Sequence, residues 1–384
     1  MIQIQSKHPV IFINQASGYL MVDIVNAFSE AGNRCVLISG SLVERNRPLN
    51  KKVRVRKIIR YNNSTSLKRI FTWGWGVIQT FMMIFFNYRK AHLFIVSNPP
   101  LAPLLPLILR NSFELLIFDV YPDAITELGI MKQQSLIISL WTKANRKIYP
   151  RAKNIFTITE GMKELIMSYA GEKQITVVPL WTDNEFLKPI PYNENYFIKQ
   201  QHLAGKFVVL YSGNIGLSND VEVLVDVAKL VNMKNIIFVI IGGGGRKKQL
   251  EDRVKNEGID NFLILPWQDV NSLPFTLSAA KLAVVTLGKG ASKLALPSKL
   301  YSLLSVGVPI LGITGKDSDL RQFIEKNDIG RCFLPENKEE IADFILYLID
   351  HPALCKNMID NALRTSKLFT NKNVAKFLNP EFSF

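Results

Sequence analysis

The chain has 384 residues, of which 48% are hydrophobic and 21% charged, and its formal net charge is +15. This composition excludes a disordered or fibrous protein, and the length predicts two domains that each bury a core. The three cysteines have neither paired spacing nor nearby histidines, so we expect reduced thiols in a cytosolic protein rather than disulfides or a zinc site. The first residues lack the apolar stretch of a signal peptide, and no apolar run approaches about 20 residues, so we expect no membrane crossing.

The first half of the chain is expected to form one α/β domain, because short β-rich runs alternate there with helical patterns. The expected strands are 10–14, 34–39, 53–58, 93–97, 115–118, 154–158 and 175–178, with helices such as 20–31 and 160–169. Prolines among polar residues then predict a linker at 186–205.

The same alternation restarts in the second half. The expected strands are 206–211, 236–240, 262–265, 282–285 and 309–312, and the expected helices are 220–231, 246–256, 272–279, 298–305, 319–326 and 339–349. We therefore predict two Rossmann-like domains that face each other across a deep cleft, with ligands at the carboxyl ends of the strands. The first domain is expected to comprise 1–185, joined by a C-terminal helix at 367–384, and the second to comprise 206–366.

Positive charge is concentrated in the first domain. Residues 1–190 hold 24 Lys and Arg against 12 Asp and Glu, whereas residues 191–384 hold 23 against 20. No acidic residue occurs between Arg45 and Phe113. The electrostatic field of this positive charge favours a polyanionic partner. The alternative is a basic surface that is simply solvated. Because the region has no helix-turn-helix, RNP-like or zinc pattern, we expect anionic lipid and no nucleic acid.

An aromatic segment lies inside this basic region. Trp73 and Trp75 are followed by Phe81, Phe85 and Phe86, and Lys and Arg stand on both sides. This mixture is typical of a helix that lies in a membrane interface, although a plain core helix would also explain it.

Three glycine-rich turns follow expected strands and precede expected helices, where backbone N–H groups can bind a phosphate. They contain Gly18, then Ser212, Gly213, Asn214 and Gly216, and then Gly242 and Gly243. Any one of them could instead be a plain turn that requires glycine. Neither a Walker motif nor a regular G-x-G-x-x-G motif is present, which disfavours an NTPase or a dinucleotide-binding enzyme.

Other candidate residues also follow strands. Asp119 would point into the cleft and could accept a proton or orient a hydroxyl, unless it serves as a helix cap. Trp267 could hold a flat base or could be a core residue. Lys299 follows Pro297 and Ser298 at the start of a helix, where the helix dipole disfavours a cation unless an anion binds there. The four histidines stand beside no plausible nucleophile.

Taken in order, these segments resemble the retaining, nucleotide-sugar-dependent glycosyltransferases of family 4, which have the GT-B fold. The resemblance is carried by the segments at 211–216, 240–244, 265–267, 296–301 and 307–311, and upstream by 97–100 and 118–122. It is strongest to the branch that builds O-antigen, capsule or colanic-acid repeat units on a lipid carrier. Two positions where many members carry glutamate hold Leu294 and Ser302 here, so the ribose contact is unassigned.

The resemblance implies transfer of a sugar, with retention, from a UDP- or GDP-sugar to a polyprenyl-diphosphate-linked glycan. It implies neither a cofactor nor a metal ion. Asp119 and Lys299 are the expected catalytic residues. The residues expected to bind the donor are Gly18, Ser212, Gly213, Asn214, Gly216, Gly242, Gly243, Arg246, Trp267, Pro297, Ser298 and Tyr301. The basic first domain would dock on the anionic inner face of the plasma membrane from the cytoplasm. The alternatives are a sugar-nucleotide epimerase and a non-catalytic binder of nucleotide sugars or polyanions.

Overall fold

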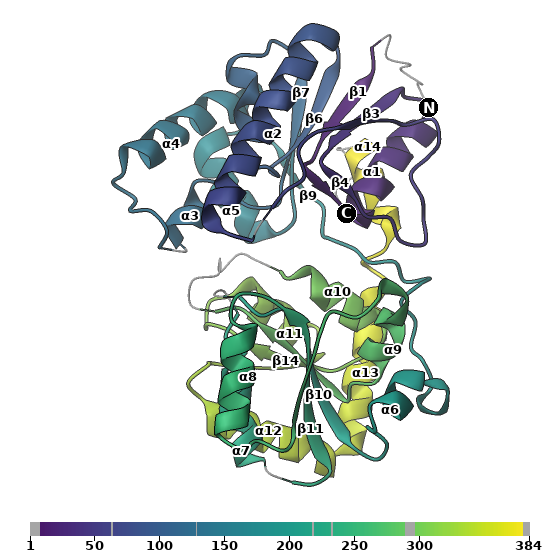
Figure 1. Ribbon diagram of the computed structural model, residues 1–384. Helices are drawn as coiled ribbons and strands as arrows, with labels where there is room; N and C mark the ends of the chain where they lie inside the picture. Colours follow the sequence, from purple (N-terminus) through teal and green to yellow (C-terminus); the bar gives the residue numbers. More distant parts are fainter. Residues whose placement is uncertain are drawn as a thin grey trace. The chain divides into compact units, whose positions relative to one another are not determined.

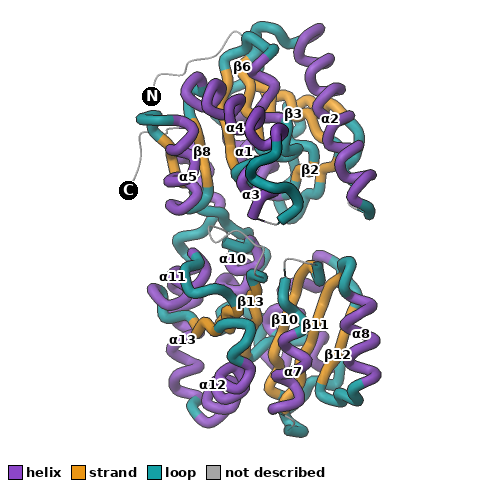
Figure 2. The backbone as a smooth tube through the Cα atoms, turned by 90° about the vertical axis from the view of Figure 1, so that its left-hand side faces the viewer, coloured by secondary structure: helices purple, strands orange, loops and turns teal. Residues whose placement is uncertain are grey.

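The computed structural model describes residues 8–62, 64–127, 129–216, 219–231, 233–288 and 296–378. The chain divides into two compact units (Figure 1). Unit 1 comprises Met1–Leu180 together with Asn371–Phe384, and unit 2 comprises Trp181–Thr370. The predicted α/β class with two parallel sheets is confirmed, and Figure 2 shows the strands of each unit gathered between helices.

Unit 1 is built on a seven-stranded parallel sheet with the order β5-β3-β1-β6-β7-β8-β9. Most of its strands are continuous apolar runs buried on both faces, as expected for a parallel sheet covered by helices. The strands are β1 (Val10–Ile13), β3 (Cys35–Ser39), β5 (Arg54–Lys57), β6 (His92–Val96), β7 (Phe113–Ile117), β8 (Ile155–Thr157) and β9 (Ile175–Val177). A separate parallel pair consists of β2 (Ala16–Ser17) and β4 (Ser41–Leu42).

The helices of unit 1 connect these strands. They are α1 (Tyr19–Glu30), α2 (Ser66–Asn87), α3 (Asp123–Glu127), α4 (Leu136–Ile148) and α5 (Glu160–Ala170), with 3₁₀ turns η1 (Ala102–Leu107) and η2 (Tyr149–Arg151). Side-chain caps begin two of them: Thr65 accepts a hydrogen bond from the N–H of Lys68, and Thr159 accepts one from the N–H of Met162.

Helix α2 is the longest helix described, and it crosses from β5 to β6 of the same sheet. Thr72, Thr80 and Ile84 on one face are buried, whereas most of the opposite face is exposed. Within the described residues, Leu67–Asn87 is the one helix long and apolar enough to span a membrane, and 22% of its most apolar window is buried. The sequence did not lead us to expect a helix of this length, because its apolar runs are interrupted by polar residues and glycines.

Unit 2 has a six-stranded parallel sheet with the order β12-β11-β10-β13-β14-β15. Its strands are β10 (Phe207–Asn214), β11 (Ile236–Gly243), β12 (Phe262–Leu265), β13 (Leu282–Thr286), β14 (Ile310–Ile313) and β15 (Gly330–Phe333). Its helices are α6 (Tyr196–Gln200), α7 (Val223–Leu230), α8 (Lys247–Asn256), α9 (Leu273–Ser278), α10 (Ser298–Ser305), α11 (Asp319–Lys326), α12 (Lys338–Asp350) and α13 (Pro352–Ser366), with 3₁₀ turns η3 (Tyr192–Glu194) and η4 (Val270–Ser272). The sequence did not predict β15 or α13.

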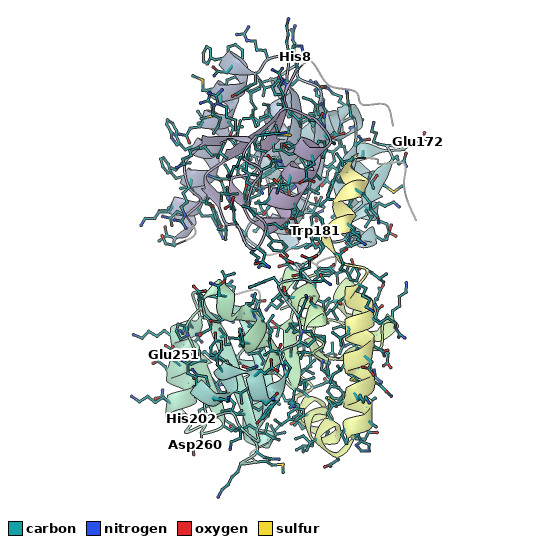
Figure 3. The ribbon with its side chains drawn as sticks, turned by 90° about the vertical axis from the view of Figure 1, so that its right-hand side faces the viewer. His8, Glu172, Trp181, His202, Glu251 and Asp260 are labelled. Carbon is teal, nitrogen blue, oxygen red and sulfur yellow. The ribbon has the colours of Figure 1, made fainter. Side chains whose placement is uncertain are left out.

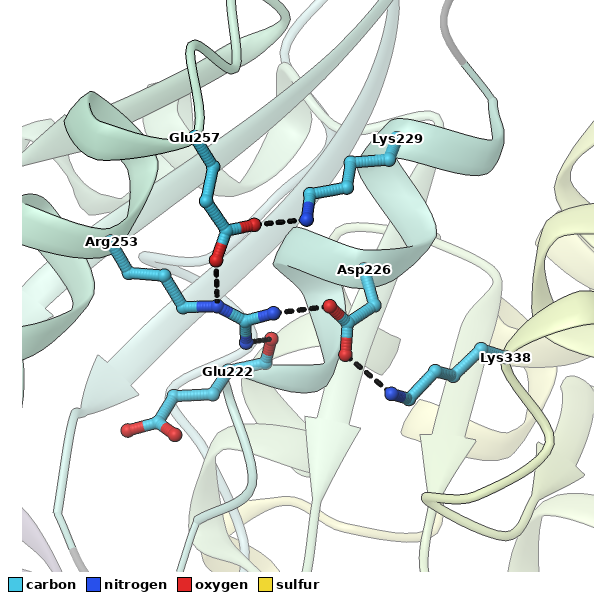
Figure 4. Close-up of polar contacts among 6 residues, drawn as sticks. All are labelled: Glu222, Asp226, Lys229, Arg253, Glu257 and Lys338. Atoms are coloured by element: carbon cyan, nitrogen blue, oxygen red, sulfur yellow. Dashed lines mark hydrogen bonds and ion pairs between the residues drawn. The ribbon is translucent and has the colours of Figure 1, made fainter.

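Charged side chains join three helices of unit 2 (Figure 4). Arg253 on α8 pairs with Asp226 on α7 and with Glu257, while Lys338 on α12 also pairs with Asp226. Burial disfavours ionisation of Asp226, but its hydrogen bonds to Lys338 and Arg253 outweigh burial and lower its pKa. The network stabilises the outer helices of the unit and lies away from the carboxyl ends of the strands.

The expected linker at 186–205 is part of unit 2 in the structure. The Asn195 side chain donates a hydrogen bond to the carbonyl of Phe275, and Phe197 and Ile198 are buried. Trp181, labelled in Figure 3, is already buried at the first position of the unit. Apolar side chains spaced along this polar segment pack into the unit 2 core. The prolines and polar residues around them predicted a linker instead.

The C-terminal segment returns to unit 1, as η5 (Asn371–Val374) and α14 (Ala375–Leu378). Phe377 is buried there, with its ring 4.9 Å from that of Phe156 and 5.9 Å from that of Phe94. The expected helix at 367–384 is therefore a short helical turn over the described residues, and 379–384 lie outside them.

Candidate functional site

The carboxyl ends of β10 and β11 form a glycine-lined edge in unit 2. Gly213 pairs with Gly242 in register, and the N–H of Ile215 donates to the carbonyl of Gly243 at 2.8 Å. A Cβ atom on Gly242 would lie 1.9 Å from the carbonyl oxygen of Gly213, and one on Gly244 would lie 2.3 Å from that of Ile215. Backbone packs directly against backbone at Gly242 and Gly244, so only glycine fits at these two positions.

Lys299 lies beside this edge. Its Nζ atom is 3.9 Å from the centre of the Tyr211 ring, and a Cβ atom on Gly213 would approach Nζ to 2.6 Å. Within the described part of the chain, Nζ is buried and has no hydrogen-bond partner. Burial lowers the pKa of Lys299 from 10.5 to about 7. The glycine at 213 thus provides the space for a buried, unpaired amine at the end of β10.

The start of α10 adds to this site. Pro297 is the N-cap, Ser298 is the exposed first residue, and neither a side-chain cap nor an acidic residue in the first turn satisfies the free N–H groups. The helix N-terminus and the Lys299 amine are therefore available to the same anion. The structure places the Lys299 amine against Gly213, and Pro297 and Ser298 precede Lys299 at the start of α10.

Trp267 follows β12 and is 60% exposed, so it is not a core residue. A Cβ atom on Gly243 would lie 2.9 Å from its indole Nε1. An exposed aromatic face beside a glycine offers a flat ligand room to stack. Asn214 lies at the same edge, with its side-chain nitrogen 2.6 Å from where a Cβ of Gly216 would be. The part-buried Ser212 precedes Gly213 on β10.

Arg246 stands immediately before α8. Its backbone N–H donates to the carbonyl of Ile215, which ties it to the glycine edge. Its guanidinium group lies 3.8 Å from a carboxylate oxygen of Glu222. A donor phosphate would therefore share Arg246 with Glu222, whereas Lys299 has no such competing partner among the described residues.

Two positions near α10 differ from the expected site. Tyr301 is buried in the unit 2 core, with its ring 4.9 Å from that of Phe369, so the ring faces away from a ligand. The Ser302 hydroxyl is buried 3.3 Å from that of Thr182. Every residue of α10 from Leu300 to Ser305 is buried, so both positions are enclosed by the packing of the helix. Leu294 lies outside the described residues.

In unit 1 the expected residues also lie at the carboxyl edge of the sheet. Gly18 is the N-cap of α1, and a Cβ atom there would meet open space. Asp119 follows β7 and is exposed, while its backbone N–H and that of Phe118 both donate to the Ser97 hydroxyl. Ser97 thus holds the strand end that carries Asp119, and desolvation of the Asp119 carboxyl group raises its pKa.

Two stacked aromatic pairs lie near Asp119, and the sequence analysis missed them as a group. Tyr61 and Trp73 stack with ring centres 5.9 Å apart, and Tyr121 and Trp141 stack at the same separation. Burial raises the pKa of Tyr121, and the neighbouring Asp119 and Tyr61 raise it further, which places these groups in one electrostatic neighbourhood. Tyr121 follows Asp119 by two residues, and this spacing was the feature of the sequence that could have indicated an aromatic ring near Asp119.

Over the part of the chain that the structure describes, no group of three His, Cys, Asp or Glu residues could hold a metal ion. The three cysteines are free thiols.

Comparison with known sequences identifies relatives for most of the chain. Residues 193–365 match the family model described as Glycosyl transferases group 1. "Probable glycosyltransferase WbjE" of Pseudomonas aeruginosa is 27% identical over 261 residues, 65% of this chain and 64% of the relative. "Putative colanic acid biosynthesis glycosyl transferase WcaI" of Escherichia coli K12 is 27% identical over 314 residues, 78% of this chain and 77% of the relative. The chain thus spans slightly less than two thirds of the length of WbjE.

Solved structures match nearly the whole chain. Sucrose-phosphate synthase from Thermosynechococcus elongatus superposes with a TM-score of 0.74 at 14% identity, over 97% of this chain and 98% of that one. Anabaena Alr3699/HepE in complex with UDP-glucose superposes with a TM-score of 0.70 at 14% identity, over 97% and 99%. These likenesses confirm the expected GT-B fold. Residues 193–365 carry the match to the Glycosyl transferases group 1 family.

Proposed function

We propose that the protein transfers a sugar from a nucleotide-diphosphate donor to a lipid-linked glycan during assembly of a bacterial surface polysaccharide, such as O-antigen or capsule. The observation that carries the proposal is the buried, unpartnered amine of Lys299 between the glycine edge and the start of α10. The group 1 family match, the colanic acid role in the name of WcaI and the UDP-glucose complex of HepE support the same reaction.

Unit 2 would hold the donor. The diphosphate would accept hydrogen bonds from the N–H groups at the start of α10 and from the Lys299 amine. Trp267 would stack on the base, and Arg246 would reach a phosphate oxygen at the expense of its contact with Glu222. The glycine edge would let the phosphates approach the backbone between Gly213 and Gly242.

In this reaction the leaving group is the nucleoside diphosphate, which becomes more negative as the reaction proceeds. As the glycosidic bond breaks, charge develops on the nucleoside diphosphate, and a preformed cation lowers the energy of that transition state. An anion next to Lys299 raises the pKa of its amine, so donor binding would convert it to the ammonium form at neutral pH. Lys299 and the α10 dipole then stabilise the same charge, which supports a metal-independent mechanism.

Unit 1 would hold the acceptor. Asp119 is exposed at the end of β7 and would polarise or orient the acceptor hydroxyl. The Tyr61–Trp73 and Tyr121–Trp141 pairs offer aromatic faces near it for the apolar faces of sugar rings. Retention of configuration would follow from the family 4 resemblance.

A lipid-linked acceptor requires access to a membrane surface, and α2 supports attachment at the interface. One face of α2 packs on the sheet and the other exposes Leu67, Phe71, Trp75, Ile78 and Phe86. Both flanking strands belong to one sheet, so α2 is held along the protein surface. A buried face and an exposed apolar face flanked by cations fit a helix lying in the headgroup region of the cytoplasmic leaflet.

The test is release of UDP or GDP from a panel of nucleotide sugars in the presence of lipid-linked glycan acceptors. Donors are first selected by thermal shift, because a ligand of the folded state raises the unfolding temperature. We expect Lys299→Ala to lower turnover by about 10²–10³-fold, the loss typical of one transition-state charge contact. Lys248→Ala, which removes an exposed lysine of the same unit, is the matched control and should retain full turnover.

Full turnover by Lys299→Ala would remove Lys299 from the mechanism. Donor binding without release of nucleotide from the donor, whichever acceptor is present, would identify a non-catalytic binder. Interconversion of the donor sugar in the absence of an acceptor would identify an epimerase.

A further inference from the structure

A cavity lies in unit 1, at the edge of the sheet where its strands begin. It has a volume of about 620 Å³, and its lining residues come from the beginnings of β1, β3 and β5, from the end of α1 and from Tyr88. Asp119 and Gly18 lie at the opposite, carboxyl edge of the sheet. The cavity is therefore separate from the proposed acceptor site, and its volume falls in the range of small-ligand pockets.

The lining of this cavity carries positive charge. Arg34, Lys52 and Arg54 contribute to it from two segments of the chain, and the described residues that line it include no Asp or Glu. The neighbouring Arg56 adds a fourth cation, since its Nε donates a hydrogen bond to the Tyr88 hydroxyl at 3.3 Å. Several cations around one cavity favour an anionic ligand.

An exposed apolar surface adjoins the cavity. Tyr88 lines the cavity and directly follows α2, whose last turns expose Met82, Phe85 and Phe86. The Arg89 guanidinium lies 4.2 Å from the centre of the Phe85 ring. A ligand that extends from the cavity onto α2 would thus meet cations first and aromatic rings next.

We propose that this cavity binds the anionic headgroup of a membrane phospholipid, whose acyl chains continue along the exposed end of α2. A free phosphate would use the cations alone, whereas a phospholipid uses both the cations and the apolar rings. The inference rests on the proposed membrane attachment and is independent of the sugar-transfer reaction. The cavity would fix one end of α2 at the headgroup level while its other end lies at the carboxyl edge of the sheet.

The test measures binding of a soluble short-chain lipid, dihexanoyl phosphatidylglycerol below its micelle concentration, to the full-length protein by calorimetry. Inorganic phosphate and dihexanoyl phosphatidylcholine are the comparison ligands. The cavity variant is Arg34→Gln/Lys52→Gln/Arg54→Gln. The matched control is Lys234→Gln/Lys248→Gln/Lys255→Gln, which removes the same charge from exposed positions of unit 2. Thermal unfolding checks that both variants fold.

We expect phosphatidylglycerol to bind the wild type and the control alike, and the cavity variant at least about tenfold more weakly. Phosphate and phosphatidylcholine should bind at least about tenfold more weakly than phosphatidylglycerol.

Equal binding of phosphate would show a site for free anions. An equal loss of lipid binding in the control would show that the net positive charge of the protein, and not the cavity, attracts the lipid. Either result overturns the proposal. If the cavity variant loses short-chain lipid but retains nucleotide release, the headgroup site stands apart from catalysis. If both variants bind the short-chain lipid like the wild type, the headgroup site is disproved while attachment through α2 is unaffected.

Discussion

At the scale of single residues, the function proposed for Lys299 would depend on a feature that lowers the stability of the free protein. A lysine whose Nζ is buried without a partner destabilises the folded protein in its charged form, because the interior solvates an ammonium poorly. The same desolvation strengthens its attraction to a bound diphosphate. A site of this kind sacrifices stability in the free protein and recovers it when the donor binds.

The pH dependence of Lys299→Met tests this account. The pKa of Lys299 is about 7 in the folded protein and 10.5 in the unfolded chain, so the unfolded chain binds the extra proton between these values. The destabilisation of the folded protein by the buried Lys299 amine is fully present below pH 7. It disappears as the pH rises toward 10.5. We expect Lys299→Met to raise the free energy of unfolding by up to about 5 kcal/mol at pH 6.5 and to have little effect at pH 10.5.

Denaturant unfolding of the ligand-free protein at the two pH values provides the measurement. Lys248→Met, at an exposed position on α8, should change the free energy of unfolding little at either pH. An effect of Lys299→Met that is the same at pH 6.5 and pH 10.5 would show that burial does not control this amine.

At the scale of elements, α2 shows how one helix can serve two environments. Its inner face contacts the sheet: the Gln15 side chain donates to the carbonyl of Thr72 at 2.7 Å, and Gly76 leaves room for that side chain. Its outer face is apolar, and Phe86 alone is 65% exposed. Exposure of a continuous apolar stripe of this length to water is unfavourable, and the lipid contact proposed for α2 would cover it.

Exchange of apolar for polar residues on the outer face should weaken vesicle binding. We expect Ile78→Ser/Phe86→Ser to lower the fraction bound to phosphatidylcholine–phosphatidylglycerol vesicles by about tenfold or more, since each buried side chain contributes about 1.5–3 kcal/mol. The midpoint of denaturant unfolding should stay unchanged because both side chains are exposed. Cosedimentation with vesicles measures the effect.

Leu230→Ser/Leu368→Ser is the matched control, because both leucines are exposed in unit 2. Vesicle binding by the α2 variant equal to that of the control would exclude α2 as the attachment surface.

At the scale of the whole molecule, the chain ends in the unit where it began. After α13 of unit 2, the segment from Asn371 rejoins unit 1 and packs the Phe377 ring against those of Phe94 and Phe156. The core of unit 1 therefore combines residues that precede unit 2 in the sequence with a segment that follows it. Synthesis of unit 2 must precede the final closure of the unit 1 core.

Removal of the Phe377 ring should destabilise unit 1 selectively. We expect Phe377→Ala to lower the free energy of unfolding of unit 1 by about 3–5 kcal/mol, as for other buried aromatic rings. The expected result in calorimetry is a lower unfolding temperature for unit 1, with nucleotide-sugar binding by unit 2 retained. Phe86→Ala, an exposed phenylalanine of the same unit, should leave both transitions in place. A shift in unit 2 instead would contradict this division of the chain.

Local patterns in the sequence determined much of this protein. The apolar runs that became β1, β3, β6 and β7 were evident because a strand buried on both faces must be continuously apolar. The glycine turns and the lysine at the start of α10 were also evident, because each depends on only a few neighbouring residues.

Tertiary structure decided what depends on contacts between distant residues. Neighbouring residues do not reveal that Lys299 lies over Tyr211, that Tyr301 faces the core while Trp267 is exposed, or that 186–205 pack on unit 2. The same is true of the cationic cavity, which gathers Arg34 and Arg54 from the starts of two adjacent strands. Local sequence patterns determine the helices and strands. Burial and desolvation arise only when these elements pack together, and they set the charge state and exposure of the candidate site residues.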